Sequence, residues 1–220
     1  MEKKFKESEI RELESQLSLP SGQMGIEVGK KMNETNIGMT LNSIDFLELK
    51  EESSVLELGH GNCGHLEKLL GLAEGVRYFG LEISETMRNE AEKNNSNRQA
   101  EFKLYDGKNL PFANNFFDRI MSVNTIYFWQ NPEKLMQEIE RTLEYNGICV
   151  LTYADKEFMK DLPLVGEKFK LFDKKDVEKL VSMSNLKIIA FRDKTEFVKS
   201  KTGEQVERKY TMAKIKKVKA

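Results

Sequence analysis

Short apolar runs alternate with segments of helical periodicity along most of the chain. Seven runs are rich in Val, Ile, Leu and Phe, and their lengths are typical of buried strands. They cover residues 55–58, 76–81, 101–105, 119–123, 148–152, 186–191 and 210–215. Between most of them, apolar residues recur every three or four positions, as on the buried face of a helix. This alternation predicts an α/β fold with a mostly parallel seven-stranded sheet and helices on both faces.

The helical segments are divided by residues that favour helix ends. Ser84 is expected to cap a helix that reaches about Asn94. Asn131 followed by Pro132 is typical of a helix start, and Gly147 is expected to end that helix. Another helix is expected over 62–72, directly behind the first strand. Between 191 and 210 there is no room for a crossover helix, so the last two strands are predicted to form an antiparallel hairpin.

The first fifty residues have a different pattern. A charged segment has apolar residues at helical spacing up to Leu17, and a stretch rich in glycine follows over 22–38. Thr40 is expected to be the N-cap of a helix that ends near Leu47. We expect residues 1–50 to form a helical lid and 51–220 to form the main domain.

Composition excludes several classes of protein. The 220 residues carry 35 Lys and Arg against 36 Asp and Glu, a formal net charge of -1, so charge alone favours neither nucleic acid nor an acidic membrane. No apolar run approaches the ~20 residues needed to cross a bilayer. The N-terminus is too charged for a signal peptide, and the two cysteines lie far apart. We expect a cytoplasmic protein that acts on a small molecule, binds no nucleic acid and does not insert into a membrane, either a monomer or a homodimer.

Candidate chemistry concentrates where the predicted strands end. Residues 55–66 read VLELGHGNCGHL, a strand followed by glycines at 59, 61 and 64. Glycine allows the chain to turn sharply and brings backbone N–H groups close to a ligand. In a parallel sheet, ligands bind outside the carboxyl ends of the strands. The polar or glycine residues at those ends are Glu57, Gly59, Glu82, Asp106 and Asn124.

The glycine loop by itself does not identify the ligand, because Gly-x-Gly-x-x-Gly also occurs in dinucleotide-binding proteins. Glu82 is placed to accept hydrogen bonds from ribose hydroxyls, which is compatible with either class. Glu57, however, would repel a pyrophosphate and suit a cation, and no Lys or Arg stands in the loop. Asp106 could accept a hydrogen bond from an adenine amino group. Adenine, ribose, a positive charge and an amino-acid end are combined in S-adenosylmethionine.

The sequence resembles a class I S-adenosylmethionine-dependent methyltransferase of the small ubiquinone/menaquinone-biosynthesis-like type (type 11). Residues 55–61 are similar to the first motif of that family, and 78–84 to its acidic second motif. The stretch 106–118 resembles the segment with the adenine-binding acid. Arg141-Thr142-Leu143 resembles the helix end before the fifth strand, and together these motifs cover about 54–153.

The resemblance implies a Rossmann-like, doubly wound fold and a role for each matching residue. Glu57, Gly59 and Gly61 would hold the methionine end of S-adenosyl-L-methionine. Glu82 would bind the ribose and Asp106 the adenine. Backbone at Ile83 and Gly107 would flank the adenine ring, and Asn124 would lie below the sulfonium.

Two departures from the family pattern affect these expectations. Cys63 stands where the family often has its third loop glycine, which puts the closest approach of the loop to the cofactor in question. The usual Lys-Pro-Gly-Gly turn is replaced by residues 144–147, a change expected to affect only a surface turn. His60, Cys63 and His65 are potential ligands, but with no fourth candidate nearby we assign them neutral or packing roles and expect no metal.

Catalytic and acceptor-binding residues are less well defined. His60 and Tyr127 are weak candidates for a catalytic role, His60 as a base near neutral pH. Tyr127 and Trp129 are candidates for the substrate pocket, with core packing as the alternative. Residues 124–127 lack both prolines of the Asn-Pro-Pro-Tyr motif of nucleic-acid amino methyltransferases.

We therefore expect an enzyme that moves a methyl group to a small-molecule acceptor by in-line displacement, with catalysis mainly by proximity. Two alternatives stay open from the sequence. One is a methyltransferase acting on RNA or protein, and the other is a non-catalytic, cofactor-binding partner subunit.

Overall fold

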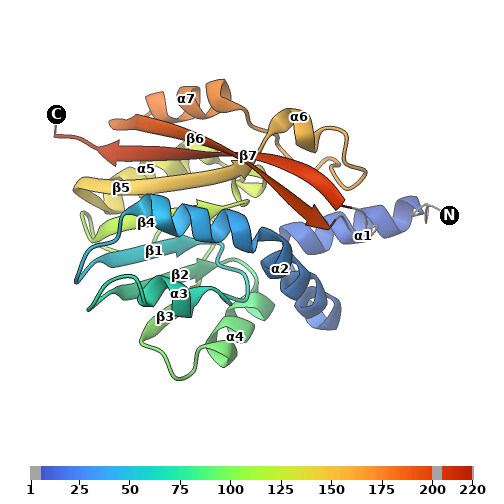
Figure 1. The fold of residues 1–220 in the computed structure, drawn as a ribbon, viewed down its shortest axis with the longest axis horizontal. Helices are drawn as coiled ribbons and strands as arrows, with labels where there is room; N and C mark the ends of the chain where they lie inside the picture. Colours follow the sequence, from blue (N-terminus) through green and yellow to red (C-terminus); the bar gives the residue numbers. More distant parts are fainter. Residues whose placement is uncertain (1–5, 200–204, 220) are drawn as a thin grey trace.

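The seven predicted strands form one sheet in the computed structural model, which describes residues 6–199 and 205–219. The strand order is β3-β2-β1-β4-β5-β7-β6 (Figure 1). Strand β7 runs antiparallel to both of its neighbours, β5 and β6, and the other described strand pairs are parallel. The strands are β1 Ser54–Leu58, β2 Arg77–Glu82, β3 Ala100–Leu104, β4 Phe117–Val123, β5 Leu143–Ala154, β6 Leu186–Lys199 and β7 Gln205–Lys217. The prediction of a Rossmann-like, mostly parallel sheet with a C-terminal antiparallel hairpin is confirmed.

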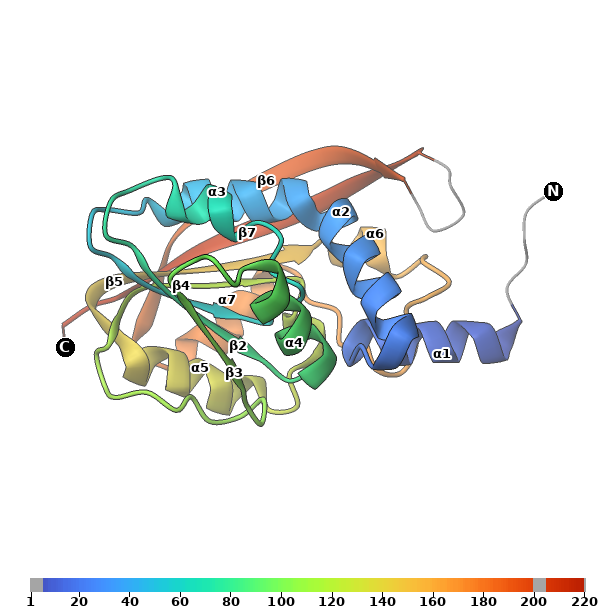
Figure 2. The same cartoon turned by 90° about the horizontal axis from the view of Figure 1, so that it is seen from below.

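Helices cover both faces of the sheet (Figure 2). One face carries α2, α3 and α4 over a core centred on Leu47, Val55 and Leu66. The other carries α5 and α7 over a core that includes Phe117 and Ile139. The helices are α1 Glu7–Ser18, α2 Gly22–Leu47, α3 Leu66–Leu70, α4 Glu85–Asn94, η1 Ile126–Phe128 (a 3-10 helix), α5 Pro132–Thr142, α6 Lys156–Met159 and α7 Lys174–Ser182.

Two predicted helix starts are confirmed at the level of single hydrogen bonds. The Ser84 hydroxyl accepts a bond from the backbone N–H of Met87 at the start of α4. The Asn131 side chain accepts one from Lys134 at the start of α5. Both caps satisfy a backbone donor that the first helical turn leaves without a partner.

Several expected boundaries are wrong. Thr40 is no N-cap, because α2 runs without a break through the glycine-rich stretch 22–38. The helix expected over 62–72 is reduced to the short α3, since a tight turn occupies the residues before it. Helix α5 ends at Thr142 instead of Gly147, because β5 already begins at Leu143 to pair with β4.

The long helix α2 joins two parts of the molecule. Its second half packs on β4 and β5 and contributes Met39, Ile44 and Leu47 to the core. Its first half contacts α1 and α4, beyond the sheet (Figure 2). Among the described residues, no helix is both long enough and apolar enough to cross a membrane.

Candidate cofactor and acceptor site

The glycine loop after β1 lies at the carboxyl ends of the parallel strands. Gly59 has φ +73° and Gly61 has φ +58°, conformations that L side chains rarely adopt. The N–H of Gly59 donates to the carbonyl of Leu81 at 2.8 Å, which ties the loop to β2. A Cβ added at Gly59 would lie 2.4 Å from Cγ2 of Thr125, so this position has no room for a side chain.

Glu82 ends β2 with its carboxylate turned toward this loop. Its Oε2 accepts the N–H of Gly61 at 3.0 Å. Its Oε1 accepts the N–H groups of Ile83 at 2.8 Å and Ser84 at 3.1 Å. These backbone bonds hold a buried carboxylate in one orientation, and a carboxylate at this position can accept hydrogen bonds from ribose hydroxyls.

Asp106 and Gly107 form an exposed turn after β3. Oδ1 of Asp106 accepts the N–H groups of Lys108 and Asn109 at 2.8 and 2.7 Å, and these bonds lower the pKa of its carboxyl to about 2. Gly107 has φ +72°, and a Cβ built there would lie 3.4 Å from Cγ2 of Ile83. The turn therefore places Gly107 beside the half-exposed side chain of Ile83, next to a carboxylate that is ionised at neutral pH.

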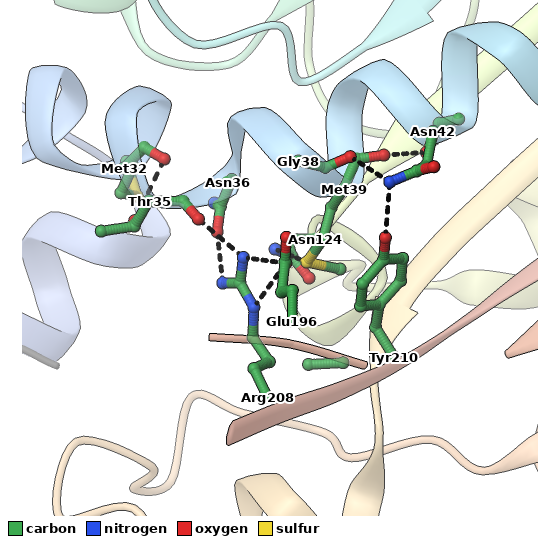
Figure 3. A network of polar contacts seen from close by, with 12 residues as sticks. Met32, Thr35, Asn36, Gly38, Met39, Asn42, Asn124, Glu196, Arg208 and Tyr210 are labelled. Atoms are coloured by element: carbon green, nitrogen blue, oxygen red, sulfur yellow. Dashed lines mark hydrogen bonds and ion pairs between the residues drawn. The ribbon is translucent and has the colours of Figure 1, made fainter. Parts of the chain in front are cut away.

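Asn124 links the end of β4 to α2 (Figure 3) and also to η1. Its φ is +57°, and its amide nitrogen donates to Sδ of Met39 at 3.2 Å. Its amide oxygen accepts the hydroxyl of Tyr127 at 3.0 Å. The predicted residues at the ends of β1, β2, β3 and β4 thus lie at one edge of the sheet.

The candidates for catalysis and acceptor binding are buried. Tyr127 is 3% exposed and Trp129 is 5% exposed, and both belong to the core beside α5. The Tyr127 hydroxyl also accepts the N–H of Ala154, and burial raises its pKa. Nε1 of Trp129 donates to the Thr125 hydroxyl at 3.0 Å. Both aromatic residues thus pack in the core, which was the alternative to a place in the substrate pocket.

His60 packs against β2 and β3. Its ring centroid lies 5.0 Å from that of Phe102, and a Cβ added at Gly80 would be 2.6 Å from its Cδ2. Burial lowers the pKa of the imidazole, which favours the neutral form. Nε2 of this ring has no hydrogen-bond partner among the residues that the structure describes.

Next to the loop lies a buried polar cluster of Glu57, Cys63, His65 and Tyr78. Nε2 of His65 lies 2.7 Å from Oε2 of Glu57, and the Tyr78 hydroxyl donates to the same oxygen at 2.5 Å. Sγ of Cys63 lies 3.2 Å from the Tyr78 hydroxyl. Ligand atoms of Glu57, Cys63 and His65 all lie within 4.8 Å of one another, and contacts within the cluster already engage each of them.

The electrostatics of this cluster follow from the close His65–Glu57 pair. Burial opposes the charge on His65, but the Glu57 carboxylate outweighs burial and raises the pKa of His65 well above its ordinary value. Burial likewise opposes ionisation of Glu57, and His65 and Tyr78 reverse that effect and lower its pKa. Sequence reasoning missed Tyr78 and the pairing of His65, because the fold of the loop and the pairing of β1 with β2 bring these side chains to Glu57.

Segments far from the glycine loop in sequence close over the same edge. Oε1 of Glu14 in α1 accepts the N–H of Lys168 at 2.7 Å. In the linker between β5 and α7, the Phe169 ring lies 4.7 Å from that of Phe128, and the N–H of Lys170 donates to the carbonyl of Tyr127. The first half of α2 lies beside the loop, since a Cβ at Gly64 would be 2.8 Å from Asn33.

Arg208 of β7 fastens this part of α2 to the hairpin (Figure 3). Its guanidinium donates to the carbonyl of Thr35 and to Oδ1 of Asn36, each at 2.7 Å. It also pairs with Glu196 of β6 at 2.6 Å. Sequence reasoning gave no sign of this contact, which joins residues more than 150 positions apart.

A sequence model of the methyltransferase domain family Methyltransf_11 matches residues 56–151, the stretch from β1 to β5 that carries the glycine loop, Glu82 and Asp106. Residues 56–151 thus form a methyltransferase domain that matches the type 11 family of class I S-adenosylmethionine-dependent methyltransferases. S-adenosyl-L-methionine is the cofactor of this methyltransferase domain. A glycine loop without room for a side chain and a fixed carboxylate at the end of β2 fit that cofactor.

The chain is similar in sequence to two proteins over part of its length. It is 26% identical over 120 residues to an uncharacterized methyltransferase, YdaC of Bacillus subtilis, covering 54% of this chain and 66% of YdaC. It is 26% identical over 113 residues to a fatty-acid O-methyltransferase of Mycolicibacterium smegmatis, covering 51% of this chain and 40% of that enzyme. The chain thus spans less than two thirds of the length of either relative.

Similarity to a solved structure supports the fold of the chain. A chain in the complex between the Haloferax volcanii Trm112 methyltransferase activator and a methyltransferase superposes with a TM-score of 0.74. The match covers 89% of this chain and 95% of that chain at 15% sequence identity.

Proposed function

We propose that this protein transfers the methyl group of S-adenosyl-L-methionine to a small, partly apolar acceptor. The observation that carries the proposal is the meeting of three features at one edge of the sheet. These are the glycine loop, the Glu82 carboxylate bonded to it, and the turn at Asp106. This arrangement suits a ligand with a ribose, an adenine and a cationic amino-acid end.

Each of these residues has a proposed contact with the cofactor. Glu82 would bind the ribose hydroxyls and Asp106 the adenine amino group, with Ile83 and Gly107 against the ring. Gly59, Gly61 and Glu57 would enclose the methionine end. Asn124, at the end of β4, would lie below the sulfonium.

Methyl transfer requires little of the protein beyond aligning the acceptor with the methyl group. When bound, the cofactor supplies a methyl group on a sulfonium that is already a good leaving group. The protein then has to hold the acceptor in line, about 3 Å from the methyl group, and keep water out. Neither His60 nor Tyr127 is exposed, which agrees with catalysis that needs no dedicated base.

Two segments are proposed to form a lid over the acceptor. Helix α1 with the first half of α2 meets the linker 155–172 through the bond from Lys168 to Glu14. Phe128 and Phe169 give the underside of this linker an apolar character, with Tyr127 and Trp129 just below. A relative named for a fatty-acid acceptor agrees with an apolar substrate, although it shares only part of this chain.

Two measurements test this function. S-adenosylhomocysteine should raise the melting temperature of the protein, and Glu82→Ala should abolish most of that rise because it removes the proposed ribose acceptor. Glu85→Ala, which changes an exposed glutamate one turn away, is the matched control and should keep it. No shift with the unmodified protein would contradict the proposal.

The acceptor class is tested by incubating the protein with methyl-labelled cofactor and a cell extract. Label in the lipid or small-molecule fraction is expected. Label in RNA or protein would replace the small-molecule acceptor with a macromolecule. Cofactor binding without transfer to any fraction, together with a tightly bound protein, would instead identify a partner subunit.

A further inference from the structure

The buried cluster of Glu57, Cys63, His65 and Tyr78 connects both ends of the glycine loop. Glu57 lies two residues before Gly59, and His65 directly follows Gly64. Their side chains meet at 2.7 Å, so one contact fixes the distance between the two ends of the loop. Closing a loop in this way removes conformations that the chain would otherwise sample.

Tyr78 ties this pair to β2. Its hydroxyl donates to the Glu57 oxygen that also contacts His65, and it lies within hydrogen-bonding distance of Cys63. The four side chains come from β1, the loop, the residue before α3, and β2. Each is buried, so no water competes for these hydrogen bonds.

Cys63 explains why the cluster is needed. It has φ +50°, a left-handed conformation that costs energy for any residue with a Cβ. The family often has glycine here, which would adopt this conformation without strain. In this chain the Cys63 side chain is fully buried and its sulfur lies against Tyr78 and 4.0 Å from His65. These contacts hold Cys63 in a backbone conformation that glycine would adopt without strain.

We propose that His65 and Tyr78 are positioning residues, which act through Glu57 to hold the glycine loop in the shape that receives the cofactor. This inference rests on the proposed function of the loop. Neither residue is assigned a contact with the cofactor. The side-chain bonds of the cluster instead compensate for the backbone strain that arises because cysteine stands in place of the third glycine.

The charge on His65 makes this proposal testable by pH. The groups around His65 are Glu57 from β1, Cys63 and His60 from the loop, and Tyr78 from β2. Glu57 is the only carboxylate among them and keeps His65 protonated at neutral pH. When alkaline pH removes that proton, the ionic contact across the loop is lost and cofactor affinity should fall.

The experiment compares His65→Gln and His65→Leu with the unmodified protein by calorimetric titration of S-adenosylhomocysteine between pH 6 and 9. Gln keeps an amide donor close to the position of Nε2 but carries no charge, whereas Leu keeps neither. We expect His65→Leu to bind about 10-fold or more weakly, as for loss of a charge-assisted bond. His65→Gln should be intermediate and lose the alkaline fall. An unchanged affinity and pH profile in His65→Gln would overturn the proposal.

Hydrogen exchange of the loop amides 59–65 without cofactor tests the cluster separately from the proposed function. Tyr78→Phe should speed this exchange about 10-fold, by loss of a buried bond to a charged group. The matched control is Tyr210→Phe, which removes a buried phenol hydroxyl bonded to Asn42 on the same face and should leave the loop unchanged. If the unmodified protein binds no cofactor, the proposed function fails, and this exchange still decides the positioning role. Equal exchange in the two Phe variants would overturn the positioning role. This test does not depend on whether the His65 variants fold.

Discussion

At the scale of single residues, buried charge is the feature with the clearest physical consequences. Glu57 and His65 are almost fully buried, and each stabilises the ionised form of the other. Removing one partner of such a pair costs about 3–5 kcal/mol, because the other is left as an uncompensated buried charge. His60 is the opposite case, since burial favours its neutral form.

These three groups predict how stability depends on pH. The lowered pKa of His60 costs stability as pH falls below its ordinary value of 6.5, because the unfolded chain binds the proton more readily. The lowered pKa of Glu57 adds a further loss as pH falls through that pKa, below 4.5. The raised pKa of His65 gives stability that is complete below 6.5 and is lost as pH rises through the raised value. We expect the free energy of unfolding to be greatest near pH 6.5, where the two histidine contributions balance.

Urea unfolding between pH 4 and pH 9 measures this profile. His65→Gln should flatten the alkaline side and leave the acid fall from His60 in place. An alkaline fall of equal steepness in the variant would show that other groups cause it.

At the scale of elements, the course of α2 is set by close contacts that glycine allows. Gly38 is the clearest case, because a Cβ there would lie 2.1 Å from Oε2 of Glu196. That carboxylate pairs with Arg208, which also bonds to Thr35 and Asn36 of the helix (Figure 3). The glycine is therefore a point of contact between helix and hairpin, although in the sequence it suggests a helix break.

A pair of substitutions at this contact should show a reversal of sign. Gly38→Ala alone should destabilise the protein by up to about 1 kcal/mol, because the methyl group displaces the Glu196 carboxylate from its ion pair with Arg208. In a Glu196→Ala background the space is free, and Gly38→Ala should then stabilise by up to about 1 kcal/mol through helix propensity. Urea unfolding of the four proteins measures the coupling. The same effect of Gly38→Ala in both backgrounds would contradict the contact.

At the scale of the whole molecule, the edge of the sheet that carries the proposed cofactor contacts is covered by parts from both ends of the chain. Helix α1 and the linker 155–172 are joined by Glu14, and α2 lies between the glycine loop and the hairpin. A ligand held at this edge would contact elements that are otherwise joined by few bonds.

Cofactor binding should therefore slow hydrogen exchange selectively. We expect protection in the loop 59–64 and in 25–39 of α2 when S-adenosylhomocysteine is added. Helix α7, which packs on β6 away from these segments, serves as the internal control and should be unchanged. Equal protection of α7 and the loop would indicate global stabilisation instead of closure over the edge.

Most of the fold could be predicted from local pattern, because strands and helices differ in hydrophobic period and in their end residues. Ser84 and Asn131 marked helix starts correctly, since a cap is a contact within a few residues. Thr40, Gly147 and the helix over 62–72 were misplaced, because packing against distant segments decides where those elements begin and end. The residues proposed for the cofactor could be found because strand ends converge in any parallel sheet.

The sequence by itself determined the order of strands and helices, the antiparallel hairpin and the glycine loop with its acids. These features depend on periodicity, turn residues and motif spacing, which are all local. Only the tertiary structure decided that Glu57 pairs with His65 and Tyr78, that Arg208 fastens α2 to the hairpin, and that Tyr127 and Trp129 lie in the core. Those contacts join residues from separate segments, and their energies come from burial and close approach, which exist only once the chain has folded.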